Sequence, residues 1–390
     1  MGDRSFHEGG KDGQRAGKAV LALAALILVT VAAPAPPQKA DIRIEDGVRV
    51  VRNPKTPVAG PGGVPATLSL VEDLVIGNGM SREGHRFGSL NGLDVDALGN
   101  IYTVDLSNNI RIRIFAPDGS LVRALELEGQ GPGEFSEPGG IIATVDGTFA
   151  VSDVLNGRIS FFTREGAHLK NISFGAFRIG DLAIDGRSNL FATHIPCPIG
   201  DKQTWELIKF DPDLKPLLTI HSISIPFKLR VVNLIPDRLF FALADEGRLA
   251  WMVSTEYIVQ VVDSSGKAMM KIIKDRDPQK FKEKDRDKLI KAWFPGGANP
   301  QFEIQTPKYF PAASGFMTDD RGRIYIRTYD TDGRGGVSMD VFDVDGLYVA
   351  RFFVPEDEDP ADIRNDKLYS IVTDPASGNP LVKRYALKWK

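Results

Sequence analysis

Aspartate, asparagine and arginine recur together in two segments of the chain, at nearly the same spacing. Residues 153–158 carry the pattern Asp-x-x-Asn-x-Arg, and residues 105–111 carry it with one residue added. Carboxylates beside guanidinium groups can take part in acid–base chemistry. A set that recurs at a regular interval is more typical of charge-assisted hydrogen bonds that join repeated units. We therefore interpret six residues as structural: Asp105, Asn108, Arg111, Asp153, Asn156 and Arg158.

Metal ligation and nucleophilic catalysis both lack a complete set of residues. Metal sites need clustered ligands, whereas the histidines after residue 40 are scattered along the chain as His85, His168, His194 and His221. The segment His194-Ile-Pro-Cys197 has a His-x-x-Cys spacing, which alone predicts a loop with a buried thiol. The Gly-x-Ser-x-Gly pattern of a nucleophile elbow does not occur. We predict no metal, no cofactor and no catalytic set.

The composition excludes several functional classes. The 390 residues are 25% charged with a formal net charge of −3, so the chain lacks the basic excess that nucleic-acid binding requires. Its single cysteine excludes an intrachain disulfide, a cysteine-rich zinc module and a Cys-x-x-Cys redox centre. Hydrophobic residues make up 42%, an average value for globular proteins. We therefore expect a globular protein that does not bind nucleic acid.

Residues 1–40 are predicted to be a targeting segment. Ala19–Ala33 contains one polar residue, Thr30, and follows a flank with four basic residues. As a helix this run would span about 22 Å, short of the ~30 Å hydrocarbon core of a bilayer. The pattern predicts a signal peptide or, because prolines follow the small residues behind the run, a retained N-terminal membrane anchor. Either segment would place residues 41–390, whose net charge is −5, in the periplasm or cell envelope.

An apolar residue followed four positions later by a turn residue marks a repeat of about 48 residues. The mark occurs five times, each time between two runs that alternate apolar and polar residues. Glycine accepts the positive φ of such turns, so each mark predicts a β-hairpin. Successive marks are separated by 47, 48, 52 and 80 residues, and they end at Gly119, Gly166, Leu214, Gly266 and Gly346.

Four short strands in each repeat predict one blade of a β-propeller. The last interval, of 80 residues, is longer than the repeat of about 48 residues. When this extra length is subtracted, residues 93–390 correspond to about 5.5 blades. The C-terminal tail supplies two clear strands of a sixth blade, and Thr67–Ile76 is a strand without a blade of its own. We predict an all-β fold, a six-bladed propeller of four-stranded antiparallel blades, in which this N-terminal strand completes the last blade and removes its open edge.

The excess length falls in an insertion at residues 276–311. Residues 285–294 are predicted to form a short helix, which starts at an aspartate and ends before Pro295-Gly296. It is the only helix that we expect after residue 40. The charge run Lys280–Lys291 is interpreted as a solvated face, with a partner-docking lid as the alternative.

The first two repeats resemble the NHL repeat. The resemblance rests on Asp153–Ile159, preceded by Gly129–Phe135 and Pro138, and on the similar run Asp105–Ile112. Residues 41–390 as a whole resemble the exported bacterial six-bladed β-propellers of the NHL/TolB-like group, including the stretch Ile42–Pro54 that is typical of them. The resemblance implies a platform that binds proteins, peptides or glycans. Some relatives are metal-dependent lyases or lactonases with ligands around the central cavity.

The later repeats carry large or charged residues where the first two have ordinary ones. Propellers bind partners at a face around the central channel, where loops of different blades converge, and Tyr, Trp and Arg are enriched at binding hot spots. The alternative for the two tryptophans of this set is packing between sheets. The predicted binding residues are Arg178, His194, Trp205, Trp251, Arg327 and Tyr329.

These observations predict a non-enzymatic binding or scaffold protein whose loop face binds a protein, peptide or glycan. Contact with a membrane is expected only through the N-terminal segment. The alternative is an extracytoplasmic hydrolase or lyase, similar to lactonases or amidating lyases, with a site at the channel mouth that uses His194 and neighbouring carboxylates. Three or more His, Asp or Glu side chains around one point would favour the enzyme, and arginines with aromatic side chains would favour binding.

Overall fold

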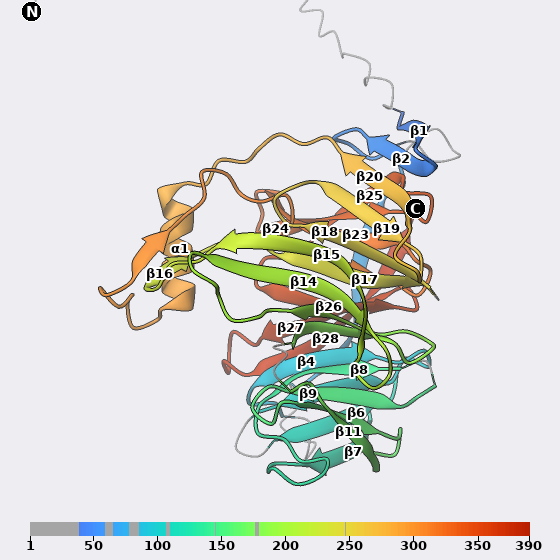
Figure 1. Cartoon of the computed structure of the whole chain (residues 1–390), viewed down its shortest axis with the longest axis vertical. Helices are drawn as coiled ribbons and strands as arrows, with labels where there is room; N and C mark the ends of the chain where they lie inside the picture. Colours follow the sequence, from blue (N-terminus) through green and yellow to red (C-terminus); the bar gives the residue numbers. More distant parts are fainter. Residues whose placement is uncertain are drawn as a thin grey trace, which may run out of the picture. The chain divides into compact units, whose positions relative to one another are not determined.

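The structure is a computed structural model that describes residues 39–58, 65–77, 86–106, 110–144, 146–175, 179–245 and 247–390 (Figure 1). The predicted targeting segment at residues 1–40 lies almost entirely outside these ranges. Within them, no helix has the length and hydropathy that crossing a membrane requires.

Six four-stranded antiparallel units, here called blades 1 to 6, make up the fold. Blade 1 contains β4 (Leu90–Val95), β5 (Ile101–Asp105), β6 (Arg111–Phe115) and β7 (Leu121–Glu126). Blade 2 contains β8 (Pro138–Ala143), β9 (Phe149–Asp153), β10 (Arg158–Phe162) and β11 (His168–Ser173). Blade 3 contains β12 (Ile179–Ile184), β13 (Leu190–His194), β14 (Lys202–Phe210) and β15 (Pro216–Pro226).

The remaining three blades follow the same strand order. Blade 4 contains β17 (Leu239–Asp245), β18 (Arg248–Val253), β19 (Ile258–Val262) and β20 (Ala268–Lys274). Blade 5 contains β22 (Gly315–Thr318), β23 (Ile324–Thr331), β24 (Gly336–Phe342) and β25 (Tyr348–Pro355). Blade 6 contains β26 (Glu358–Arg364), β27 (Lys367–Thr373), β28 (Pro380–Trp389) and β3 (Leu68–Ile76).

The N-terminal strand closes the ring, as the sequence predicts. β3 pairs antiparallel with β28, from Leu68 opposite Trp389 to Ile76 opposite Val382. Two segments far apart in the chain therefore share one blade, and β3 covers the edge of β28 that would otherwise be unpaired. A second N-terminal element was not predicted: the hairpin of β1 (Asp41–Glu45) and β2 (Val48–Asn53) extends blade 4, where β2 pairs parallel with β20.

Glycine is favoured at the repeat marks for two physical reasons. Each glycine has a positive φ, which L-residues with a Cβ adopt at a cost. Each also packs against the outer strand of the preceding blade: a Cβ on Gly119 would meet Leu74 of blade 6, and one on Gly166 would meet Leu125 of blade 1. The repeat in the sequence therefore results from the packing of each blade against the preceding one.

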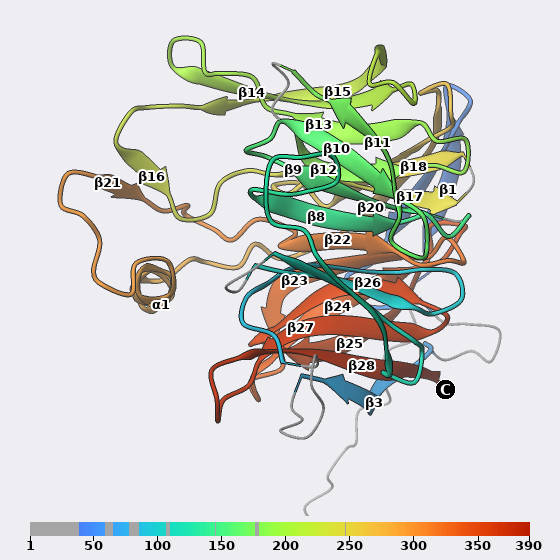
Figure 2. The same ribbon diagram turned by 90° about the horizontal axis from the view of Figure 1, so that it is seen from below.

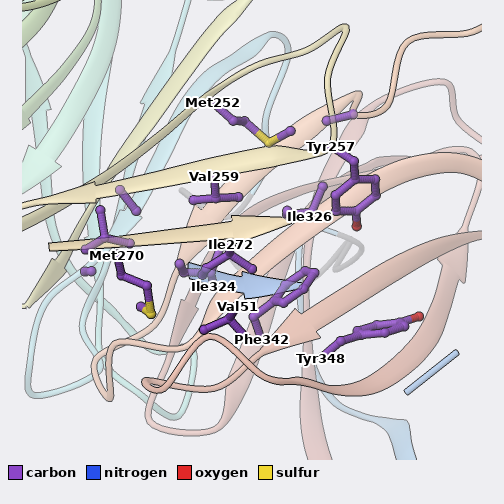
Figure 3. Packing of buried hydrophobic residues seen from close by; sticks show 14 of the residues in the cluster. Val51, Met252, Tyr257, Val259, Met270, Ile272, Ile324, Ile326, Phe342 and Tyr348 are labelled. Carbon is purple, nitrogen blue, oxygen red and sulfur yellow. The ribbon is translucent and has the colours of Figure 1, made fainter. Parts of the chain in front are cut away.

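Apolar side chains fill the spaces between neighbouring blades. Figure 3 shows the cluster between blades 4 and 5, in which Val259 and Ile272 of blade 4 pack with Ile324 and Phe342 of blade 5. Val51 from β2 joins the same cluster, so the N-terminal hairpin is part of the core. Alternation along each strand buries one set of side chains on each side of a blade, which explains the strand signal in the sequence.

Two excursions from the blades lie together at one side of the sheets (Figures 1 and 2). The insertion contains α1 (Glu283–Trp293) and β21 (Glu303–Gln305), and the link between blades 3 and 4 contains β16 (Val231–Asn233). β16 and β21 pair parallel. We call residues 227–238 and 276–311 the cap.

The single helix of the described residues starts two residues earlier than predicted. Asp285 accepts a hydrogen bond from the backbone N–H of Lys282 at 2.9 Å, so the aspartate caps the helix from its third position. Glu283 and Asp285 in the first turn and Lys291 in the last turn also oppose the helix dipole. No residue of α1 is buried.

Candidate functional site

A cavity of about 1130 Å³ lies between the cap and blades 4 and 5. The link before blade 4 contributes apolar residues such as Leu234 and Ile235, and α1 contributes Leu289 and Trp293. Blade 5 contributes Arg327 and its neighbours on β23. The cap and the propeller therefore enclose the cavity between them.

The lining is more basic than the protein as a whole. Its three acidic residues are Asp285, Glu356 and Asp359. Its six basic residues are Arg238, Lys280, Lys282, Lys284, Lys288 and Arg327. Because the whole chain carries a net charge of −3, this excess of positive charge is concentrated locally, and it attracts anionic groups.

Arg327 lies on β23 opposite Gly315 and reaches the link between blades 5 and 6. Its Nη2 donates hydrogen bonds to the backbone oxygens of Glu356 at 3.3 Å and Glu358 at 3.0 Å. Its Nη1 lies 3.7 Å from Asp359 Oδ1. The guanidinium is thus held in place at the wall of the cavity.

Arg238 is the most accessible arginine of the lining. It immediately precedes β17 and is exposed. Within the described residues, no carboxylate oxygen is placed within 4.0 Å of its guanidinium. The cation can therefore take a ligand anion without first breaking an ion pair.

An aromatic stack joins the cap to blade 5. Tyr329 stacks on Phe310 with ring centroids 4.7 Å apart, and Phe310 contacts Phe281 at 5.0 Å. Burial raises the pKa of Tyr329, so its phenol stays neutral at physiological pH. The stack anchors the base of the cap on the propeller.

Hydrogen bonds pair the two arms of the cap, residues 279–281 and 308–310. The N–H of Phe281 donates to the oxygen of Lys308 at 3.2 Å, and the N–H of Phe310 donates to the oxygen of Gln279 at 2.9 Å. Lys288 of α1 also forms an ion pair with Glu356 at 2.5 Å. The cap is therefore attached to the propeller at two places, by the Tyr329 stack and by this ion pair, and both contribute residues to the cavity lining.

The sequence-predicted binding residues separate into groups. Arg327 and Tyr329 line the cavity, whereas Arg178 lies outside the described residues. Trp251 stacks on His221 with centroids 4.0 Å apart and packs in the cluster between blades 3 and 4, as the alternative interpretation expected. Trp205 lies on β14 opposite Ile223, and neither tryptophan lines the cavity.

His194 ends β13, in the register position that Asp105 and Asp153 hold in blades 1 and 2. Its Nδ1 lies 3.1 Å from Glu206 Oε2 on the neighbouring strand. Three residues later, Cys197 is exposed, so the expectation of a buried thiol was wrong. The reason is that the chain leaves β13 after His194 and runs in a loop, where no blade covers the side chain.

The recurring aspartates hold the links between blades. Asp153 accepts hydrogen bonds from the backbone N–H groups of Ser136 at 2.8 Å and Glu137 at 3.1 Å. Arg158 donates to the oxygens of Gly131 and Glu134 in the same link, and Asn156 donates to Asp153 at 2.7 Å.

In blade 1 the recurring aspartate pairs with an arginine outside the sequence pattern. Asp105 bonds the N–H groups of Gly88 and Ser89 and pairs with Arg113 at 2.7 Å. Arg111, which the sequence pattern singled out, pairs with Glu126 at 3.0 Å. Asn108 lies outside the described residues.

A second charged cluster lies on the inner strands of blades 1 and 6. Asp94 accepts a hydrogen bond from the N–H of Ala143 at 2.7 Å and lies beside Asp362. Burial, reinforced by the charge of Asp362, raises the pKa of Asp94 to about 8, although Arg364 opposes the shift. One of the two carboxyls therefore keeps its proton at neutral pH.

Sequence reasoning missed Arg238, Phe310 and the participation of the link at 227–238. The length of this link, with Leu234 and Ile235 in it, was the available signal. No group of three or more His, Cys, Asp or Glu residues that could hold a metal ion occurs in the part of the chain that the structure describes.

No family model and no curated protein matches the sequence. Among solved structures, a Bacteroides fragilis NCTC 9343 protein named as exported has a TM-score of 0.50 and 9% identity, covering 87% of this chain and 99% of its own. A member of the DUF4221 family from Bacteroides vulgatus ATCC 8482 has a TM-score of 0.50 and 14% identity, covering 83% and 98%. A streptogramin B lyase has a TM-score of 0.42 and 9% identity, covering 83% and 98%. At these identities the first two likenesses concern the fold alone, and the resemblance to the NHL/TolB-like group is not confirmed.

Proposed function

We propose that this protein is an extracytoplasmic binding protein that takes an acidic peptide segment into the cavity under the cap. The observation that carries the proposal is the lining, with six basic and three acidic residues in a chain of net charge −3. Export is supported by the apolar run in residues 1–40 and by the fold likeness to the Bacteroides fragilis protein that is named as exported.

The shape of the cavity favours a peptide over a compact small molecule. A volume of about 1130 Å³ exceeds the range of ~300–1,000 Å³ that is usual for small-molecule sites. Residues of both attachments of the cap, the Tyr329 stack and the Lys288–Glu356 pair, line the cavity. An extended segment bound in the cavity would contact both attachments.

The walls of the cavity match a peptide that carries both charged and apolar side chains. Aliphatic and proline side chains such as Leu234, Pro236 and Leu289 line the cavity beside the basic residues. Such walls bury the apolar side chains of a bound segment. A segment that alternates acidic and apolar residues matches both parts of the lining.

Selection of random nonapeptides displayed on phage against the full chain tests this function. We expect enrichment of Asp and Glu beside apolar residues, and a loss of binding of about tenfold in Arg238→Gln, since a charge-assisted hydrogen bond is removed. Lys215→Gln is the matched control, because Lys215 is exposed on blade 3 away from the lining. Selected peptides without acidic residues, equal binding by Arg238→Gln, or binding of glycans alone on an array would contradict the proposal.

The His194–Glu206 pair favours a second function, an extracytoplasmic hydrolase or lyase at the channel mouth. A carboxylate 3.1 Å from Nδ1 of a histidine is the arrangement that orients a general base. Release of product from a panel of lactones and amidated peptides by the wild-type chain, abolished in His194→Gln, would support it. Equal rates in wild type and His194→Gln would refute it.

A further inference from the structure

A second, smaller cavity of about 230 Å³ lies at the junction of blades 4 and 5. Three cationic side chains border its inner part: Lys274 at the end of β20, Arg276 two residues later, and Arg351 on β25. Gln279 and Tyr329 line both this cavity and the larger one. The two cavities are therefore neighbours that share part of a wall.

Lys274 is buried beside a carboxylate that it shares with a second cation. Only 3% of its side chain is exposed, and its ammonium lies 3.4 Å from Asp340. The rings of Tyr257 and Tyr348 flank the ammonium at 4.7 Å and 4.9 Å, and Figure 3 shows both rings at one end of the apolar cluster. Burial lowers the pKa of Lys274, because the charged form loses hydration.

Asp340 cannot neutralise all of the surrounding charge. It accepts hydrogen bonds from the hydroxyls of Tyr257 at 2.5 Å and Tyr348 at 2.7 Å, and from Nε of Arg351 at 2.7 Å. Lys274 is a second cation on the same carboxylate. One negative charge is thus shared between two positive charges, and Arg351 takes Asp330 as a further partner at 3.3 Å.

Arg276 adds a third cation with no carboxylate in contact. Its Nη2 donates to the backbone oxygen of Phe310 at 2.8 Å, and burial lowers the pKa of its guanidinium. Within the described residues, no salt bridge to Arg276 occurs. At the rim, Lys55–Asp277 and Arg52–Asp275 neutralise each other at 2.5 Å and 3.3 Å. The inner part therefore holds three cations against Asp330 and Asp340.

We propose that the small cavity is an oxyanion site, in which Lys274 and Arg276 bind a carboxylate or an inorganic phosphate. An excess positive charge next to a half-enclosed space is costly unless an anion fills it. Since one water occupies about 30 Å³ of liquid, the cavity has room for a small oxyanion together with some of its hydration. The anion can be free in solution, or it can be a carboxylate of a peptide that occupies the larger cavity.

Titration of the full chain with sodium phosphate and with sodium acetate tests the site. Ionic strength is held constant with sodium chloride, and the thermal unfolding midpoint and the heat of binding are measured. We expect a saturable rise of the midpoint, since a ligand that binds only the folded state stabilises it. In Arg276→Gln the affinity falls by about tenfold or more, because a charge-assisted contact is lost; Arg276→Lys recovers part of it.

Lys215→Gln is the matched control, because Lys215 is exposed and lines neither cavity. The midpoint of Arg276→Gln without added anion establishes that the variant folds. Failure of both anions to raise the midpoint above the chloride control, or an equal effect in Arg276→Gln, would overturn the site.

Competition identifies the source of the anion. If acetate displaces a selected acidic peptide from the wild-type chain, the site belongs to the peptide's carboxylate. If acetate and peptide bind together, the site takes a free anion. Both outcomes support the oxyanion site, and acetate binding without any peptide binding would sink only the proposed function.

Discussion

Replacement of Gly166 by alanine tests whether the repeat glycines encode blade-to-blade packing. Gly166 lies in the turn of blade 2 with a φ of +85°, and a Cβ at this position would lie 2.6 Å from Cδ1 and 2.9 Å from Cδ2 of Leu125. Gly157 in the same blade has a φ of +60°, with no atom within 4 Å of its Cβ position. The two glycines share the backbone strain and differ in the space beside them.

The expected costs follow from these two differences. A left-handed backbone costs an L-residue about 1–2 kcal/mol, and alanine regains about 0.4–1 kcal/mol through the unfolded chain. Gly157→Ala should therefore destabilise the protein by about 1 kcal/mol. Gly166→Ala also displaces the partly buried Leu125 side chain, which costs about 1 kcal/mol more, the low end of the range for overpacking.

Urea unfolding monitored by tryptophan fluorescence measures both variants against wild type. In the double variant Gly166→Ala with Leu125→Ala, the overpacking disappears, so the two substitutions should show a favourable coupling of about 1 kcal/mol or more. Equal destabilisation by Gly157→Ala and Gly166→Ala, or additive effects in the double variant, would refute the packing argument.

Two further predictions concern protons and the cap. Since the pKa of Asp94 is raised to about 8, the folded state keeps a proton that the unfolded state loses near pH 4, so stability falls as pH rises from about 4 to about 8. Asp94→Asn should reduce this fall by up to about 1.4 kcal/mol per pH unit, and an unchanged slope in urea unfolding would contradict it. Tyr329→Ala removes the stack on Phe310, worth about 0.5–1.5 kcal/mol. Trypsin should then cut the cap roughly two- to tenfold faster, whereas Tyr329→Phe should match wild type; equal rates in all three would contradict it.

The fold was largely predictable because its signals are local. The alternation of apolar and polar residues along each strand indicates which side of the blade is buried. The turn glycines are needed because their φ is positive and because the neighbouring blade leaves no space for a Cβ. The strand at 67–76 was assigned to blade 6 because blade 6 lacked an outer strand, and β3 lies there. The helix of the insertion was within two residues of its observed start, since acidic residues and a proline–glycine pair bound it.

Two residues that line the candidate site were predictable because they depart from the sequence repeat. Arg327 and Tyr329 stand out from the repeat and line the larger cavity. Trp251 stands out in the same way, but it is partly buried against the cluster between blades 3 and 4 instead. A departure from the repeat shows that a residue is special, but the side of the blade that it faces depends on the neighbouring sheet.

The sequence by itself determined the architecture, because strand period, turn chemistry and blade length act over a few residues. Only the tertiary structure decided where the cavities are. The link at 227–238 and the insertion at 276–311 meet through β16 and β21, and this pairing brings Arg238, Lys284 and Arg327 around one space. Lys274 and Arg351 likewise converge on Asp340 from different blades. The sequence does not show which charged residues come together when they are distant in the chain. Their contacts result from the closure of the ring and the pairing of two loops.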